Sequence, residues 1–243
     1  MTEIYSRKHP KPAGDWVYFS VHRFLNALVW LLIRPEITGR EHVPAHGAYL
    51  FTTNHMSFFD SILVFCIVPH RMVAFGADKW RRSVGLRQFC EMLGIIWVAR
   101  GEADAEAIKA TLGVLKRGGA MGLAPEGTRN KLGTLQPGKP GAAYLADRAK
   151  VPIVPCGMAG TETVIKSWKS LRRPRVRVVI GPTYMLAGSG RAKGPQLEVF
   201  TEEIMCRIAA LLPAKYRGVY AEHPLLARFL AAEGAAAPVG SGR

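Results

Sequence analysis

A histidine and an aspartate stand five residues apart in the segment Asn54-His-Met-Ser-Phe-Phe-Asp60, directly after a short apolar run. This pattern predicts a strand that leads through a turn into a helix. His55 then lies at the mouth of the sheet, and the carboxylate of Asp60 can reach one imidazole nitrogen. That contact would fix the tautomer and make the other nitrogen a stronger base. On spacing alone, the alternative is a loop histidine and a helix-start aspartate with no joint role.

Few other groups near this turn are suited to catalysis. No serine or cysteine occupies an obvious nucleophile elbow, so we expect His55 to take a proton directly from a substrate group. Backbone N–H groups at the start of the following helix are expected to stabilise the developing oxyanion. His42 and His46 have the spacing of a metal-ligand pair. Pro44 and Gly47 oppose a shared helix face, however, so we expect no metal site.

A second polar turn, Ala124-Pro-Glu-Gly-Thr-Arg-Asn130, follows another apolar run. Gly127 allows the backbone to approach a ligand closely, Thr128 offers a hydroxyl and an N–H, and Arg129 offers a planar donor fork. This set suits a phosphate group. The alternative is a tight turn with a solvated arginine.

A third apolar run, residues 94–98, is followed by Arg100. Parallel α/β sheets bind ligands beyond the carboxyl ends of their strands. Three strand ends would therefore bring His55, Arg100 and the Glu126–Arg129 segment to one rim.

Apolar periodicity predicts the elements that position these turns. The expected strands are 48–53, 94–98, 120–124, 151–156 and 176–180, and the expected helices are 16–33, 58–68, 105–116, 141–150 and 197–211. Asp104 is expected to cap the third of these helices. Strands that alternate with helices predict an α/β fold with a central, mostly parallel sheet flanked by helices. The low-complexity residues 231–243 are expected to be disordered.

The order of these motifs resembles that of the PlsC-type glycerolipid acyltransferases, the 1-acyl-sn-glycerol-3-phosphate (lysophosphatidic acid) acyltransferases. The resemblance covers about residues 37–184 and rests on N-H-x-x-x-x-D, the arginine at 100, P-E-G-T-R at 125–129 and V-P-I-V-P at 151–155. It implies a glycerol-3-phosphate acyltransferase-like fold. It also implies transfer of a fatty acyl group from acyl-CoA or acyl carrier protein (acyl-ACP) to the free hydroxyl of a lysophospholipid. With 1-acylglycerol 3-phosphate as acceptor, the product is phosphatidic acid, and the reaction needs no cofactor or metal.

The resemblance also implies roles for individual residues. His55 would be the general base, and Asp60 would orient it. Lys79 stands where family members often carry a lysine that contacts phosphate. The implied site for the phosphate and glycerol of the acceptor comprises Lys79, Arg100, Glu126, Gly127, Thr128 and Arg129.

Three residues beside this site depart from the family pattern. Ala99 replaces an acidic residue, Ala124 replaces an aromatic residue, and Asn130 replaces a serine. The same fold and chemistry with another acceptor therefore stays open, such as glycerol 3-phosphate, an aminolipid or a glycolipid.

Charge and apolar content together point to a membrane surface. The formal net charge is +15, and hydrophobic residues make up 49% of the chain. The apolar segment 16–33 contains His22 and Arg23, and a central arginine is costly in a bilayer. We therefore expect an N-terminal helix that associates with an anionic membrane surface without spanning it, with a buried core helix as the alternative.

The expected organisation is a basic arm and interfacial amphipathic helix at 1–36, a catalytic domain at 37–218, and a partly disordered tail at 219–243. The four cysteines are far apart in the sequence, which favours reduced thiols. We expect the protein to act at the cytoplasmic face of the membrane as a peripheral or monotopic enzyme.

A nucleic-acid-binding protein is the alternative from another class. The segment 166–177 has six basic residues and no acidic one, and Trp168 within it could stack on a base. This alternative leaves the His55–Asp60 pair and the apolar N-terminus unexplained, so we expect no nucleic-acid partner. The same segment suits anionic lipid headgroups or the phosphates of CoA.

Overall fold

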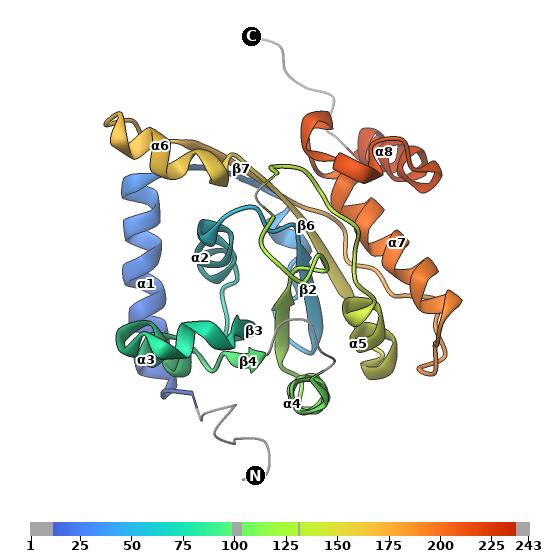
Figure 1. The fold of residues 1–243 in the computed structure, drawn as a ribbon, viewed down its shortest axis with the longest axis horizontal. Helices are drawn as coiled ribbons and strands as arrows, with labels where there is room; N and C mark the ends of the chain where they lie inside the picture. The colour runs from blue at the N-terminus through green and yellow to red at the C-terminus, as the bar shows by residue number, and fades with distance from the viewer. Residues whose placement is uncertain (1–11, 99–103, 131, 237–243) are drawn as a thin grey trace.

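The computed structural model describes residues 12–98, 104–130 and 132–236. Helices and strands alternate along most of this length (Figure 1). The strands are β1 Arg34–Thr38, β2 Tyr49–Thr53, β3 Met72–Ala77, β4 Ile96–Val98, β5 Ala120–Leu123, β6 Ile153–Ala159 and β7 Arg175–Ile180. The helices are α1 Asp15–Leu32, α2 Phe58–Ile67, α3 Val84–Leu93, α4 Ala105–Lys116, α5 Gly141–Ala149, α6 Val164–Lys169, α7 Pro195–Ala210 and α8 Pro224–Ala236.

The strands form one sheet in the order β1-β7-β6-β2-β5-β3-β4. Strands β6, β2, β5, β3 and β4 are mutually parallel, and β7 runs antiparallel to β6. Strand β1 is parallel to β7, with Arg34 beside Arg175. The carboxyl ends of the five parallel strands and the starts of β1 and β7 therefore lie at one edge of the sheet, here called the C-terminal edge.

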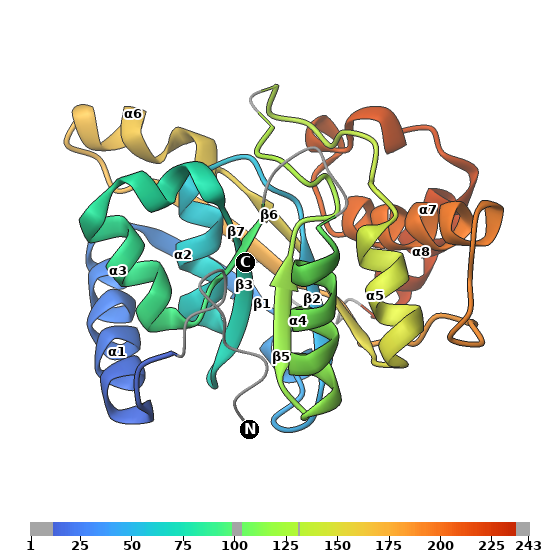
Figure 2. The ribbon, with the colours of Figure 1, turned by 60° about the horizontal axis from the view of Figure 1, so that its bottom comes forward.

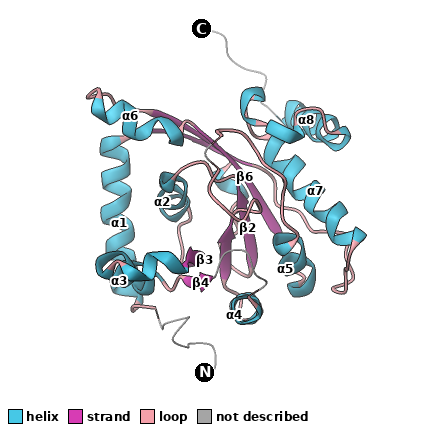
Figure 3. Cartoon of the chain, in the orientation of Figure 1, coloured by secondary structure: helices cyan, strands magenta, loops and turns pink. Residues whose placement is uncertain are grey.

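Helices cover both faces of this sheet (Figures 2 and 3). Every residue of β2 is buried, as expected for a central strand between two helical layers. Successive side chains of β2 point to opposite faces: Leu50 packs in the core shared with α4, α5 and α7, whereas Tyr49 and Phe51 pack in the core shared with α1 and α2. The expected α/β sandwich with a mostly parallel sheet is confirmed.

Several elements were not expected from the sequence. They are β1, β3, α3, α6 and α8. Pro35 lies within β1, which is tolerated because β1 is an edge strand. The predicted boundary at residue 36 therefore falls inside a strand.

The C-terminal prediction needs a similar correction. Helix α8 extends to Ala236, so the residues from 231 to 236 are helical, and residues 237–243 lie outside the described ones. Tyr220 and Leu226, within the predicted tail, are almost fully buried and belong to the core formed with α7. The segment 219–236 is thus part of the folded domain.

Helix α1 presents one face to the core and another outward. Tyr18 and Val29 are buried, and the Asn26 amide donates a hydrogen bond to the carbonyl of Cys66 at the end of α2 (3.2 Å). The outward face carries exposed large apolar side chains: Trp16, Phe19, Phe24, Leu28, Trp30 and Leu31. Among the described residues, no helix has both the length and the apolar character needed to cross a bilayer.

Candidate active site

His55 and Asp60 meet at the C-terminal edge, as their spacing predicted. The Nδ1 atom of His55 lies 3.1 Å from Oδ2 of Asp60. Asp60 is buried, whereas 21% of the His55 side chain is exposed. With Nδ1 donating to the carboxylate, Nε2 carries the lone pair, and it bonds to no residue that the structure describes. This geometry is that of a histidine prepared to accept a proton.

Asp60 also fixes the start of α2. The same Oδ2 atom accepts hydrogen bonds from the N–H groups of Met56 (2.7 Å) and Ser57 (2.6 Å), and the Ser57 hydroxyl oxygen accepts one from the N–H of Phe59. Ser57 and Asp60 therefore form a capping box. The Ser-x-x-Asp spacing is a sequence signal for this box. The capping box explains why Asp60 lies close enough to hold the histidine.

The backbone of His55 is held by the loop that follows β5. Its N–H donates to Oε1 of Glu126 (2.9 Å), and its carbonyl accepts the N–H of Asn130 (2.8 Å). The strands that carry these two loops, β2 and β5, are neighbours in the sheet. The second polar turn thus supports the catalytic turn through two backbone contacts.

Glu126 was predicted to bind the acceptor, and the structure places its carboxylate in a buried position against backbone groups. Its side chain is 3% exposed, and its second oxygen, Oε2, accepts the N–H of Gln136 (3.2 Å). Burial raises the pKa of Glu126, while the hydrogen bonds from the His55 and Gln136 N–H groups lower it in part. Both oxygens hold backbone, so the geometry supports a positioning role.

Asn130, one of the three departures from the family pattern, bonds within its own loop. Its side-chain oxygen accepts the N–H of Leu132 (2.7 Å), and its amide nitrogen donates to the carbonyl of Thr134. The side chain is nearly buried and closes its own loop. It therefore lies away from the open rim.

The open part of this turn contains Gly127, Thr128 and Arg129. Gly127 and Thr128 are exposed, and Arg129 is half-buried. Gly127 has a φ of 71°, and an added Cβ would lie 2.9 Å from Cδ of Lys139. Lys139 therefore brings an amine beside the turn. The sequence analysis missed it, because its position follows from the path of the intervening loop.

Asn54 ties the catalytic turn to the neighbouring strand. Its amide nitrogen donates to the carbonyl of Met158, and its amide oxygen accepts the N–H of Met158, both at 2.8 Å. Asn54 is 1% exposed. This reciprocal pair fixes the end of β2 against β6 just before His55.

The other predicted contacts are placed less directly. Lys79 is exposed and follows β3, which ends at the same edge, and its amine lies 5.2 Å from the centre of the Trp80 ring. Arg100 and Ala99 lie outside the described residues. The N–H groups of His55, Met56, Ser57 and Phe59 already bond within the two turns. These four were among the expected oxyanion donors, so that expectation does not fit them in this conformation.

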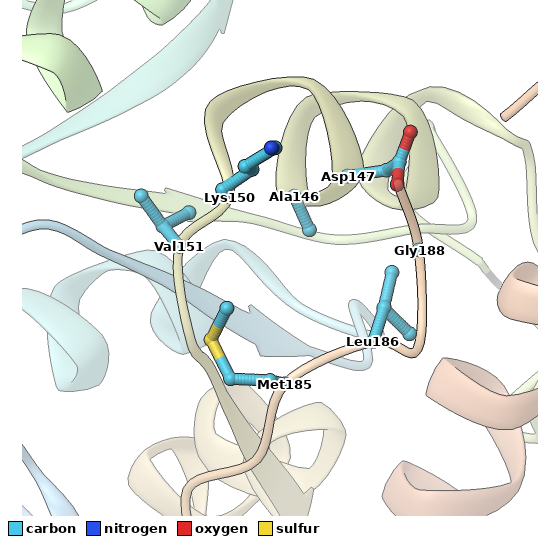
Figure 4. A pocket seen from close by; sticks show the side chains of 7 residues that line it. All are labelled: Ala146, Asp147, Lys150, Val151, Met185, Leu186 and Gly188. Carbon is cyan, nitrogen blue, oxygen red and sulfur yellow. The ribbon is translucent and has the colours of Figure 1, made fainter. Parts of the chain in front are cut away.

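A small pocket of about 110 Å³ lies at the opposite edge of the sheet (Figure 4). Its lining includes Asp147, Lys150 and Gly188, between the end of α5 and the loop after β7. Both oxygens of Asp147 accept backbone N–H groups, from Gly190 and Ala192 at 2.9 Å. The pocket is thus built around a buried loop anchor and is separate from the His55 site.

Comparison with known proteins agrees with the motifs. The acyltransferase family model matches residues 34–159, more than half of the chain. A human 1-acyl-sn-glycerol-3-phosphate acyltransferase alpha is 34% identical over 132 residues, which are 52% of this chain and 46% of that protein. The Bacillus subtilis 1-acyl-sn-glycerol-3-phosphate acyltransferase is 24% identical over 72% of this chain and 87% of its own.

The fold has a counterpart among solved structures. The crystal structure of the 1-acyl-sn-glycerophosphate acyltransferase PlsC from Thermotoga maritima matches with a TM-score of 0.61 and 22% identity, covering 78% of this chain and 77% of that one. The chain spans about half the length of the mammalian relatives it matches. From the extent of the family match, the chain belongs to the acyltransferase family.

Proposed function

We propose that this protein transfers a fatty acyl group from acyl-CoA or acyl-ACP to the free hydroxyl of 1-acylglycerol 3-phosphate, giving phosphatidic acid. The observation that carries the proposal is the His55–Asp60 contact at the C-terminal edge, with Nε2 available to a substrate. The names of the relatives support this choice of acceptor. No cofactor takes part beyond the thioester co-substrate.

The reaction follows from the state of the imidazole. Nε2 of His55 removes the proton of the acceptor hydroxyl, and the oxygen attacks the carbonyl carbon of the thioester. The tetrahedral intermediate collapses, the C–S bond breaks, and the proton on Nε2 passes to the leaving thiolate. An ester and a free thiol result. Asp60 keeps the imidazole oriented and stabilises its charged form during the transfer.

The acceptor's phosphate is assigned to the open turn after β5. Arg129 provides a fork that matches two phosphate oxygens, and the exposed Gly127 permits close approach. Lys139, beside Gly127, and Lys79, at the end of β3, add positive charge at the same edge. Arg100 belongs to this proposed site through its sequence position alone.

We place the enzyme at the cytoplasmic face of an anionic membrane, held peripherally by α1. The outward face of α1 combines exposed large apolar side chains with the exposed Ser20 and Arg23, a mixture that suits the boundary between headgroups and acyl chains. All four cysteines are free, in keeping with a reducing compartment.

His55→Ala tests the reaction. We expect its turnover to fall by roughly 10²–10⁴-fold while the far-UV circular dichroism and the unfolding midpoint stay near wild type, because His55 is partly exposed. The assay offers acyl-CoA and acyl-ACP against a panel of acceptors: 1-acylglycerol 3-phosphate, glycerol 3-phosphate, an aminolipid and a glycolipid. Near-wild-type turnover by His55→Ala would refute the catalytic assignment. A preference for an acceptor without phosphate would refute the proposed substrate.

A further inference from the structure

A strongly basic hairpin projects from the C-terminal edge beside the site. It comprises residues 164–173, which contain α6 and the turn into β7, and is called the basic hairpin below. Lys166, Lys169 and Arg172 are exposed and form no ion pair with any described residue. The acidic residue closest to this segment in the sequence, Glu162, accepts bonds from the Tyr216 hydroxyl (2.8 Å) and the N–H of Gly160 (3.1 Å). The hairpin therefore presents uncompensated positive charge.

The tip of the basic hairpin breaks a local rule of helix termination. The N–H of Leu171 bonds the carbonyl of Trp168, and the N–H of Arg172 bonds that of Ser167, both at 2.9 Å. This pattern places the residue after the cap in the left-handed region, where glycine or asparagine is usual. Leu171 occupies that position with a φ of 53°, and its side chain is 98% exposed. A bulky apolar residue held in this strained conformation in water points to a role outside the fold.

The basic hairpin is fastened to the end of α1. The Trp168 indole N–H donates to the carbonyl of Leu32 (2.9 Å), and the Arg173 guanidinium donates to the carbonyl of Ile33 (3.0 Å) and to that of Trp30. Figure 1 shows α6 lying across one end of α1. The apolar face of α1 and the basic hairpin therefore meet at one corner of the molecule.

The same hairpin touches the catalytic helix. The ring of Trp168 packs edge-on against Phe59 in the first turn of α2, with centroids 5.1 Å apart. Phe58, next to Phe59 and three residues after His55, is 46% exposed. Exposed apolar surface therefore runs from the catalytic turn toward the basic hairpin.

We propose that the basic hairpin is a second membrane contact, with Leu171 inserted among the acyl chains and the surrounding cations on anionic headgroups. This inference rests on the membrane association in the proposed function and adds the surface that aims the C-terminal edge at the bilayer. Positive charge around an exposed apolar tip complements an anionic membrane surface. Ile165, also largely exposed, extends the apolar part.

Partition into vesicles tests the proposal in the full-length protein. The probe is sedimentation with vesicles of equimolar phosphatidylcholine and phosphatidylglycerol, against vesicles of phosphatidylcholine alone. The triple variant K166Q/K169Q/R172Q is expected to bind the anionic vesicles about 100-fold more weakly, at roughly fivefold per charge. Its matched control, K116Q/R191Q/K193Q, removes three exposed charges at the opposite edge and should bind like wild type. Equal losses in both triples would overturn the proposal, because net charge alone would then explain binding.

Leu171 is tested separately from charge. Leu171→Asn removes the apolar chain but tolerates the left-handed conformation, so it should fold like wild type and bind anionic vesicles about tenfold more weakly. Leu171→Met keeps an apolar chain and should restore binding to within about twofold of wild type. Wild-type vesicle binding by Leu171→Asn would overturn the insertion of the tip.

Further measurements distinguish membrane lipid from CoA and nucleic acid as the ligand of the basic hairpin, and distinguish this proposal from the proposed function. In a vesicle-free assay with a short-chain acceptor below its micelle concentration, the hairpin triple should keep the wild-type KM for acyl-CoA. A raised KM would place the hairpin at the phosphates of CoA and overturn the membrane contact. If the hairpin triple lost affinity for a fluorescent oligonucleotide but kept wild-type vesicle binding, the membrane contact would also be overturned. Absence of acyl transfer by the wild type would contradict the proposed function, whereas the vesicle results would still decide the role of the hairpin.

Discussion

Asp60 joins three groups through one oxygen atom. Oδ2 contacts the His55 ring and two backbone N–H groups, whereas the buried Oδ1 has no hydrogen-bond partner among the described residues. An amide could keep its oxygen in the place of Oδ2, but it carries no negative charge to stabilise the protonated ring. The carboxylate thus links the structure of the helix start to the basicity of the histidine.

Asp60→Asn is therefore expected to lower kcat by about 100-fold or more, because the imidazolium formed during proton transfer loses the negative charge that stabilises it. Ser57→Ala is the matched control: it removes the hydroxyl that caps Phe59 and should cost about 1 kcal/mol of stability with kcat near wild type. Steady-state kinetics and urea unfolding measure the two effects. Equal kinetic defects in both variants would show that Asp60 acts only through the helix cap.

Glu126→Gln tests positioning against substrate contact. The amide can accept from only one of the two N–H groups that the carboxylate now satisfies. We expect kcat to fall by about 10–100-fold, because the His55 turn loses its alignment, with both KM values little changed. A raised acceptor KM at unchanged kcat would instead support the contact with the acceptor that the family resemblance implied.

The same variant should change the pH dependence of stability. Because burial raises the pKa of Glu126 above its ordinary value of 4.5, the folded state holds this proton more tightly than the unfolded state does. The contribution of Glu126 is therefore fully present below pH 4.5 and is lost as the pH rises through the folded pKa. Glu126→Gln should remove that decline, measured as free energy of unfolding against pH. An unaltered profile would contradict the burial effect.

Arg129→Lys probes the proposed phosphate site. The lysine keeps the charge but loses the bidentate fork, so the KM for the acceptor should rise by roughly tenfold, equivalent to about 1.4 kcal/mol. The KM for the thioester should change little when each substrate is varied at saturation of the other. Arg117→Lys, at the far end of α4, serves as the control. A raised donor KM with an unchanged acceptor KM would move Arg129 to the CoA phosphates.

The sequence predicted the His55–Asp60 pair because both residues belong to one turn and one helix start. Local spacing is enough to bring such residues together. The residues that support the backbone of His55 could not be predicted from the sequence. Glu126 and Asn130 reach it only because β5 lies beside β2. A motif assigns residue types to a site, but burial and partners decide which of them face the substrate.

At the scale of elements, the strands flanked by clear turns were predicted, and the weaker ones were not. Strand β1 is short, contains Pro35 and has only two apolar side chains, Pro35 and Ile37, so its sequence gives only a weak strand signal. Strand β3 follows α2 after only Val68–Arg71, and its apolar residues have no helical or alternating period of their own. Pairing with β7 and β5, respectively, stabilises these strands, and pairing is a property of the assembled sheet.

Asn54 provides a test of how neighbouring strands hold the site. Asn54→Ala leaves the buried N–H and carbonyl of Met158 without partners, so we expect a loss of about 2–4 kcal/mol of unfolding free energy together with reduced turnover. Asn26→Ala removes one bond, to the end of α2, and should cost only about 1 kcal/mol. Chemical denaturation compares the two variants. Equal losses of unfolding free energy in the two variants would show that the Asn54–Met158 pair stabilises the fold no more than a single hydrogen bond does.

At the scale of the whole molecule, α1 is part of the folded domain. Its buried face contacts α2, and the chain passes from it directly into β1. The sequence correctly placed this helix, but its apolar content could not distinguish the face that packs from the face that lies outward. Truncation before β1 would uncover core, so substitutions on the outward face give the cleaner test of membrane binding.

The double variant Phe24→Gln/Leu31→Gln changes two side chains that are 67% and 66% exposed, one above the other on α1. We expect it to bind anionic vesicles about 100-fold more weakly, since each side chain would otherwise bury apolar area in the bilayer. Val199→Gln/Val219→Gln alters two exposed apolar residues elsewhere and should bind like wild type. Unaltered binding by the α1 variant would contradict the interfacial role of this helix.

The family match covers the catalytic turns but neither of the two proposed membrane contacts. The segment that matches the family model, residues 34–159, begins with β1 and ends with β6. It carries the His55 turn and the loop after β5, whereas α1 precedes it and the basic hairpin follows it. Both outer elements are attached at the paired starts of β1 and β7, where Arg34 lies beside Arg175. The proposed chemistry therefore lies within the shared segment, and the two proposed membrane contacts are attached to it at a single corner of the sheet.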